Sequence, residues 1–106
     1  PPVEPGWARS NWQSYCVTLP PRADQLSVMQ ALLDLGVSTR RGVMNTHLEP
    51  AYEGHGAYRS TALSNSERAQ ARTIMLPLFA QMSDEDVNFV ANALSQVLSR
   101  VPEPAL

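Results

Sequence analysis

The sequence has 106 residues, of which 43% are hydrophobic and 17% are charged, and its net charge is -2. This composition is typical of a single globular domain, and it excludes the strongly basic surfaces that bind nucleic acid or anionic membranes. No apolar run is long enough to cross a membrane, and the lone Cys16 excludes a disulfide within the chain, so a reducing cytoplasm is the expected location.

Both ends of the sequence are rich in proline, which removes the backbone donors that a strand needs. We therefore interpret residues 1–10 as the remnant of a linker cut from a longer chain. Residues 11–100 are expected to form the folded domain, and residues 101–106 a C-terminal tail that ends the natural chain.

The first half of the domain predicts a strand, a helix and a second strand. Residues 12–19 are rich in aromatic and β-branched side chains, and the face of Tyr15, Val17 and Leu19 is expected to pack against a helix. Residues 24–35 carry Leu26, Met29, Leu32 and Leu33 at helical spacing, and Gly36 is placed to cap that helix in a left-handed conformation. Residues 37–44 predict a strand in which Gly42 marks a bulge or a close backbone approach.

The second half predicts a long loop, two helices and a buried segment. Residues 45–63 have no sustained period and form the expected loop. Residues 64–67 have the spacing of a capping box, which predicts a short helix over 67–73. Residues 74–79 indicate a buried extended segment. A second capping box at 83–86 opens a helix that runs to Arg100, and its three acids complement the helix dipole.

This order predicts an α+β domain with a small antiparallel or mixed sheet and helices packed on one face. The sequence has no phosphate-binding glycine loop and no Ser-His-Asp order. His47 and His55 without a third ligand are weak evidence for a metal, so no metal site is expected. Trp12 and Tyr15 are interpreted as core aromatics, and Cys16 as a buried, inert thiol.

Six short blocks of the sequence, in this order, resemble one known family. They are residues 11–15 (NWQSY), 36–44 (GVSTRRGVM), 47–52 (HLEPAY), 65–67 (NSE), 76–79 (LPLF) and 82–86 (MSDED). Together they resemble the C-terminal small domain of the DegT/DnrJ-type nucleotide-sugar aminotransferases, and the resemblance covers about residues 11 to 98.

The resemblance implies a small domain of a fold-type I enzyme that depends on pyridoxal phosphate. Such enzymes transfer an amino group, usually from glutamate, to a keto sugar nucleotide, and the family's active-site cleft lies at a homodimer interface. The cofactor and its Schiff-base lysine belong to the N-terminal large domain, which is the expected partner. All eight basic residues of this chain are arginine, which forms no Schiff base, so no cofactor, no catalytic residue and no activity are expected in the isolated chain.

Four residues are candidates for substrate binding. Arg40 or Arg41 can hold a carboxylate or diphosphate by paired hydrogen bonds, although neighbouring residues of a strand face opposite ways, so at most one is expected to reach a given ligand. The alternative for either arginine is an ion pair with the large domain. His47 matches a histidine that the family places near the cleft and can donate a hydrogen bond to a hydroxyl or keto oxygen. Tyr52 either presents its phenol to the substrate or packs the loop.

His55, Tyr58 and Arg59 match nothing as specific. Two alternatives for the whole chain stay open. One is the small domain of a same-family dehydratase, in which the lysine has been lost from the large domain. The other is a free-standing binding or dimerisation module with no catalytic partner.

Overall fold

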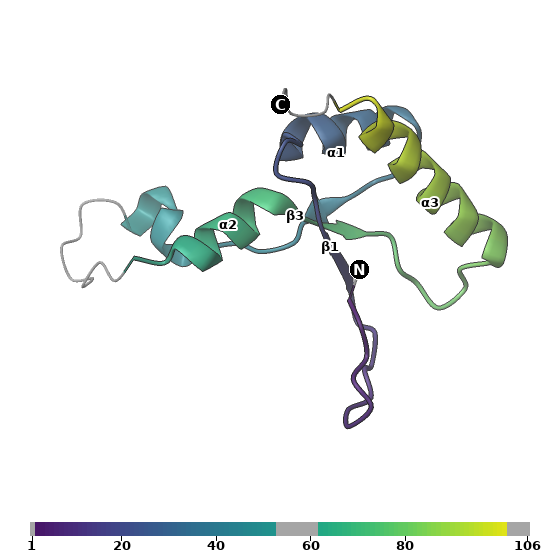
Figure 1. The fold of residues 1–106 in the computed structure, drawn as a ribbon, viewed down its shortest axis with the longest axis horizontal. Coiled ribbons are helices and arrows are strands. Elements are labelled where there is room, and N and C mark those ends of the chain that lie inside the picture. Colours follow the sequence, from purple (N-terminus) through teal and green to yellow (C-terminus); the bar gives the residue numbers. More distant parts are fainter. Residues whose placement is uncertain (1, 53–61, 102–106) are drawn as a thin grey trace.

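The computed structural model describes residues 2–52 and 62–101. Figure 1 shows its helices and strands, and their bounds are β1 Tyr15–Thr18, α1 Gln25–Asp34, β2 Arg40–Arg41, α2 Ser64–Arg72, β3 Thr73–Leu76 and α3 Asp84–Ser99. Two 3-10 helices, Thr46–Leu48 and Pro50–Tyr52, lie in the expected loop. His55, Tyr58, Arg59 and the expected tail after Val101 lie outside the described residues.

The three strands form one antiparallel sheet in the order β1-β3-β2, with β3 in the centre. Helices α1 and α3 lie together on one face of this sheet (Figure 1). Ile74 of β3 has no exposed surface and shares a buried cluster with Val28 and Leu32 of α1 and Val90 and Val97 of α3. The predicted α+β class, with a small sheet covered on one face, is confirmed.

Strand β1 is shorter than the expected strand over residues 12–19. Trp12 has a φ of 49°, a left-handed conformation that does not belong to a strand. The expected apolar face is confirmed, since Leu19 is buried and Val17 packs against the core. The expectation that Trp12 is a core aromatic is wrong, because 40% of its surface is exposed, and Cys16 is only half-buried.

Helix α1 begins and ends as the sequence predicts, but it buries a different face. Gly36 has a φ of +86°, and the N–H of Val37 donates to the Leu32 carbonyl at 2.8 Å, which completes a Schellman cap. The buried apolar residues are Val28 and Leu32, whereas Leu26 and Leu33 are more than half exposed. The side of α1 that faces α3 and the sheet therefore carries Val28 and Leu32, and it does not include Leu26 or Leu33.

The two expected capping boxes have different outcomes. At α3, the Ser83 and Asp86 side chains and backbone N–H groups bond reciprocally, as expected. At α2, the helix begins at Ser64, and the cap residue is Leu63, which makes no side-chain cap bond. The Glu67 N–H donates to the Leu63 carbonyl at 2.9 Å, so this donor is not left for a Ser64 hydroxyl. The expected capping box at residues 64–67 is therefore wrong.

Strand β2 contains only two residues of the expected strand over 37–44. The pairing extends one step further through Gly42, whose N–H donates to the Thr73 carbonyl at 3.0 Å. A Cβ at Gly42 would lie within 3.0 Å of Thr73 Oγ1 and Cys16 Sγ, so the predicted close backbone approach is confirmed. The expected buried segment over 74–79 is confirmed in part by β3, which ends before Pro77.

Substituting Gly42 tests this close approach. We expect Gly42→Ala to lower the free energy of unfolding by about 1–3 kcal/mol, because Thr73 is buried and its hydroxyl is held by the Ala69 carbonyl, so the neighbours have little room to yield. Urea unfolding measures the difference. Gly6→Ala is the matched control, since nothing lies within 4 Å of a Cβ there. Equal stability of the two variants would contradict the close approach of Gly42 to Thr73 and Cys16.

The Asp24 cap of α1 predicts a dependence of stability on pH. Hydrogen bonds from Ser27, through its side chain and then its backbone N–H, hold the pKa of Asp24 below its ordinary value of 3.8. A lowered pKa in the folded state stabilises the protein above that ordinary value, and this contribution is lost as the pH falls through the lowered one.

We therefore expect Asp24→Ala to lower the melting temperature at neutral pH, with a deficit against wild type that narrows below about pH 4. Thermal unfolding followed by circular dichroism checks this. Asp24→Asn is the control, because it keeps a capping oxygen that does not titrate in this range. A deficit of Asp24→Ala that stays constant to the lowest pH would contradict the assignment.

Candidate functional site

The sheet register places the two candidate arginines on opposite faces. Arg41 lies opposite Ile74 and Arg40 opposite Met75, and paired residues of an antiparallel sheet share a face. Ile74 is buried under the helices, so Arg41 lies on the helix-covered face at its edge. Arg40 lies on the other face, over which the described part of the chain packs no helix (Figure 1). The expectation that at most one arginine reaches a given ligand agrees with this geometry.

The two arginines line different hollows. Arg40 borders a hollow of about 320 Å³ at the edge of the sheet, together with Gln13, Ser14, Ser38 and the segment after β3. Arg41 borders a hollow of about 660 Å³ between the start of α1 and helix α2, which also contains Asp24, Leu48 and Glu67. Both arginines are exposed, and neither has an ion pair or side-chain hydrogen bond within residues 2–52 and 62–101.

His47 lies in the 3-10 helix Thr46–Leu48 and contacts α2. Its Nε2 is 3.1 Å from Glu67 Oε1, and the side chains of His47 and Glu67 are 28% and 48% exposed. Tyr52 ends the next 3-10 helix, with 42% of its surface exposed. The four candidate residues therefore do not line a common pocket among the described residues.

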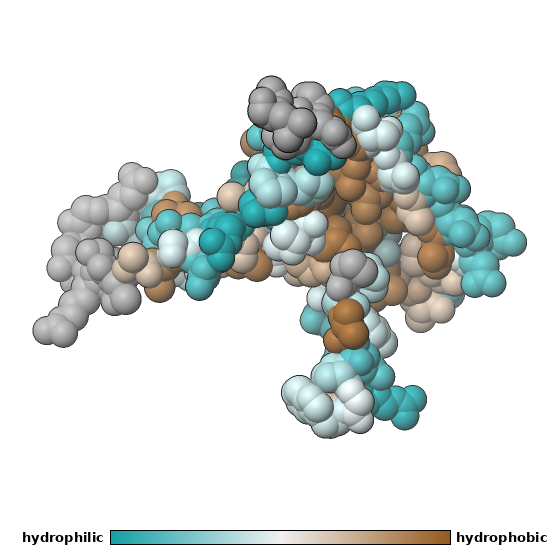
Figure 2. Space-filling model, in the orientation of Figure 1, coloured by the Kyte–Doolittle hydropathy of each residue, from teal (hydrophilic) through white to brown (hydrophobic). Residues whose placement is uncertain are grey.

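Helix α2 projects sideways from the sheet with the two 3-10 helices beside it (Figure 1). It buries none of its residues, and its visible surface is largely hydrophilic (Figure 2). Hydrogen bonds attach it instead: Gln25 Nε2 donates to the carbonyls of Gln70 and Thr73, both at 2.7 Å, and Arg72 donates to the Leu19 carbonyl at 2.9 Å. The position of His47 thus depends on these hydrogen bonds and on those of Asn45 to α2, which together we call the polar framework of α2.

Asn45 ties the His47 segment to α2. It is 5% exposed, its backbone N–H donates to Gln70 Oε1, and its Oδ1 accepts from the Ser66 hydroxyl at 2.6 Å. Reasoning from the sequence missed Asn45 and Glu67 as members of this framework. The spacing of residues 66, 67 and 70 on one helix was a usable signal, but only the fold brings residues 45–48 beside it.

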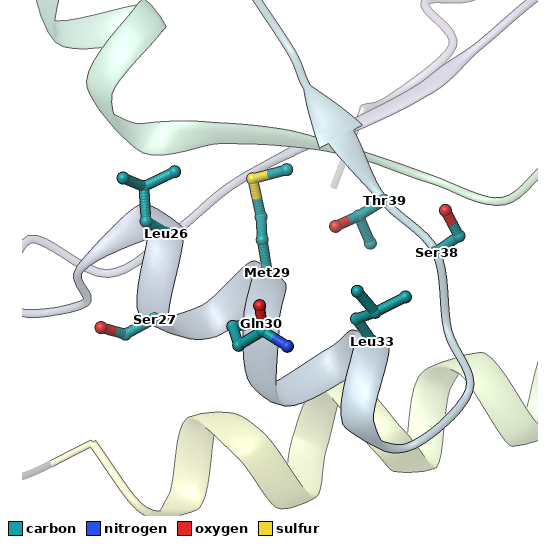
Figure 3. A pocket seen from close by; sticks show the side chains of 7 residues that line it. All are labelled: Leu26, Ser27, Met29, Gln30, Leu33, Ser38 and Thr39. Carbon is teal, nitrogen blue, oxygen red and sulfur yellow. The ribbon is translucent and has the colours of Figure 1, made fainter.

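An open apolar groove of about 490 Å³ lies between α1 and the segment that leads into β2. In Figure 3, Leu26, Met29 and Leu33 project from the same side of α1, and Leu33 lies nearest to Ser38 and Thr39. Thr39 Oγ1 is buried and has no hydrogen-bond partner in the described ranges. Apolar surface is also visible between α1 and α3 (Figure 2). Leu78 and Phe79, in the segment before α3, and Val87 of α3 are exposed apolar residues.

The sequence contains no lysine, so this chain supplies no side-chain amine for a Schiff base with pyridoxal phosphate. The described residues contain no group of three or more metal-ligating side chains. In the same ranges, no helix has the length and apolar character needed to cross a membrane.

Known proteins resemble this chain in sequence and in fold. Spore coat polysaccharide biosynthesis protein SpsC of Bacillus subtilis (strain 168) is 26% identical over 77 residues, which cover 73% of this chain and 19% of SpsC. Uncharacterized protein MJ1066 of Methanocaldococcus jannaschii is 27% identical over 78 residues, which cover 74% of this chain and 20% of MJ1066. The crystal structure of the aminotransferase TlmJ from Streptoalloteichus hindustanus superposes with a TM-score of 0.77 at 29% identity, over 93% of this chain and 25% of TlmJ.

This chain therefore spans only about a fifth to a quarter of the length of these relatives. Residues 1–95 match the DegT/DnrJ/EryC1/StrS aminotransferase family, which is most of the chain. Together with the fold shared with TlmJ, this match confirms the resemblance seen in the sequence blocks. The chain belongs to the DegT/DnrJ/EryC1/StrS aminotransferase family.

Proposed function

We propose that residues 11–100 are the small domain of an enzyme that transfers an amino group from glutamate to a keto sugar nucleotide. The observation that carries the proposal is Arg40, whose guanidinium is exposed on the uncovered face of the sheet and has no ion pair among the described residues. Family membership supports the reaction class.

The uncovered sheet face supports a partner domain. A sheet with helices on only one side is stable in water when its other face is polar, or when another layer covers it. Here that face carries Met75 and the half-buried Cys16 together with Arg40. We propose that the N-terminal large domain of the same protein covers this face, with Arg40 at the cleft between the two domains.

The exposed apolar groove of α1 supports the same proposal. Leu26 and Leu33 are 58% and 54% exposed on one side of a short helix, which is unusual for a domain that works alone. In the proposed enzyme, contacts with the large domain and with a second copy of the whole protein cover such surfaces, and the cleft lies at the homodimer interface.

The proposed roles of this chain's residues concern binding and orientation. Arg40 holds an anionic group, a carboxylate of glutamate or a diphosphate of the sugar nucleotide, by charge-assisted hydrogen bonds. His47 hydrogen-bonds a hydroxyl of the sugar, and Tyr52 lies in the same loop. Closure of the small domain excludes water and fixes the orientation of the substrates. Pyridoxal phosphate and the lysine that binds it belong to the large domain in this proposal.

The two arginines provide a matched pair of variants in the complete enzyme of this proposal. We expect Arg40→Gln to raise KM for glutamate or for the sugar nucleotide about 10- to 100-fold, because a hydrogen-bonded charge pair contributes about 1.5–3 kcal/mol. We expect Arg41→Gln, which removes the same charge from the helix-covered face, to change KM less than about threefold. Steady-state kinetics with each substrate varied in turn measures both effects.

Equal effects of the two variants would contradict the assignment of Arg40. Transamination itself is tested with pyridoxal phosphate, glutamate and a keto sugar nucleotide, and loss of water from the sugar without amino transfer would indicate the dehydratase instead. We expect no turnover from the present chain alone, since it has no lysine. Turnover by this chain would refute the proposed division between domains.

A further inference from the structure

We propose that Glu67 is a positioning residue that fixes the imidazole orientation and tautomer of His47 for substrate binding. This inference rests on the proposed role of His47 at the sugar. It concerns a carboxylate that the sequence predicts to serve a capping box, and which the structure directs elsewhere.

The contact between Glu67 and His47 determines which ring nitrogen carries a proton. An ionised carboxylate only accepts hydrogen bonds, so at 3.1 Å from Glu67 Oε1 the Nε2 of His47 must be the donor. In a neutral ring the proton then lies on Nε2, and Nδ1 keeps its lone pair. Nδ1 has no hydrogen bond within the described part of the chain, so it remains for a substrate hydroxyl.

Among the described residues, Glu67 provides the hydrogen bond that the His47 ring makes, and the His47 side chain is 28% exposed. The 3-10 helix Thr46–Leu48 is a single turn without a side-chain cap and buries none of its residues. Its backbone is held to α2 through Asn45, which bonds Ser66 and Gln70. This anchor holds the main chain two residues before His47, and the imidazole itself is hydrogen-bonded by Glu67.

Two simpler accounts of Glu67 explain less. A capping role is excluded, because the cap residue of α2 is Leu63 and makes no side-chain bond. A carboxylate in the first helical turn also complements the helix dipole, but that interaction needs no contact with a residue 20 positions away. The remaining alternative is a surface ion pair that only attaches the loop, and such pairs contribute little to stability.

A double-mutant cycle in the complete enzyme separates positioning from attachment. We expect Glu67→Ala to raise KM for the keto sugar nucleotide about 10-fold, with kcat changed less than about twofold, since one hydrogen bond to a charged group is lost. Glu67→Gln keeps an acceptor oxygen and should recover part of the loss. In a His47→Gln background, Glu67→Ala should change KM less than about twofold. Glu49→Gln, an exposed acid of the same loop, is the control and should match wild type.

An NMR measurement tests orientation without depending on activity. In protein labelled with ¹⁵N at histidine, the His47 signals are those lost in His47→Gln. We expect a protonated Nε2 in wild type and a mixture of both tautomers in Glu67→Ala. An unchanged spectrum in Glu67→Ala overturns the inference, as does an equal KM effect of Glu67→Ala with and without His47.

The two arms distinguish this inference from the proposed function. If the tautomer preference is lost in Glu67→Ala while His47→Gln leaves KM unchanged, the orienting contact stands and the placement of His47 at the sugar is refuted. If His47→Gln raises KM and Glu67→Ala changes neither KM nor the spectrum, the proposed function stands and the role of Glu67 is refuted.

Discussion

The pairing of β2 with β3 is the constraint on which the candidate site depends. Strand β2 consists of Arg40 and Arg41 alone, and its ladder continues only through the N–H of Gly42 to the Thr73 carbonyl. A side chain at Gly42 would meet Thr73 and Cys16, so the strands approach this closely only because the residue is glycine. Once that register is set, Arg41 must face the helices and Arg40 must face away from them.

A second, polar constraint positions the His47 loop. Helix α2 contributes no buried side chain, so its place cannot come from a hydrophobic face. Gln25 holds its C-terminal end by donating to two backbone carbonyls, and this amide is itself buried in the core side of α1. Because each bond has a defined direction, such an attachment fixes orientation as well as contact. Helix α2, held in this way, places Glu67 beside His47.

Short sequence patterns predicted local structure best at helix ends where the residue type favours one backbone conformation or one hydrogen bond. Gly36 allows the left-handed cap of α1, and Ser83 with Asp86 forms the capping box of α3. The capping box expected at residues 64–67 did not form, because the chain enters α2 one residue earlier than the pattern implies. A spacing pattern specifies which bonds are possible, and the preceding backbone decides which of them is made.

The buried face of α1 shows where reasoning from periodicity ends. Leucines at 26, 32 and 33 fit a helical repeat equally well, yet only Leu32 is buried, while the shorter Val28 takes a core position. The period identifies a helix but not its rotation about its own axis, which depends on where α3 and β3 press against it. Periodicity could not identify the partner of Glu67 either, because His47 lies 20 residues away in the sequence.

The sequence by itself determined the class of fold, the C-terminal cap of α1, the N-terminal capping box of α3 and the family, because each of these is encoded in short segments. At Gly42 it left a bulge or a close approach open, and the structure shows the close approach. The tertiary structure alone decided which arginine faces the open side of the sheet, which side of α1 is buried and that Glu67 meets His47. These features depend on contacts between segments far apart in the chain, and such contacts are set by packing and register, which no short stretch of residues specifies.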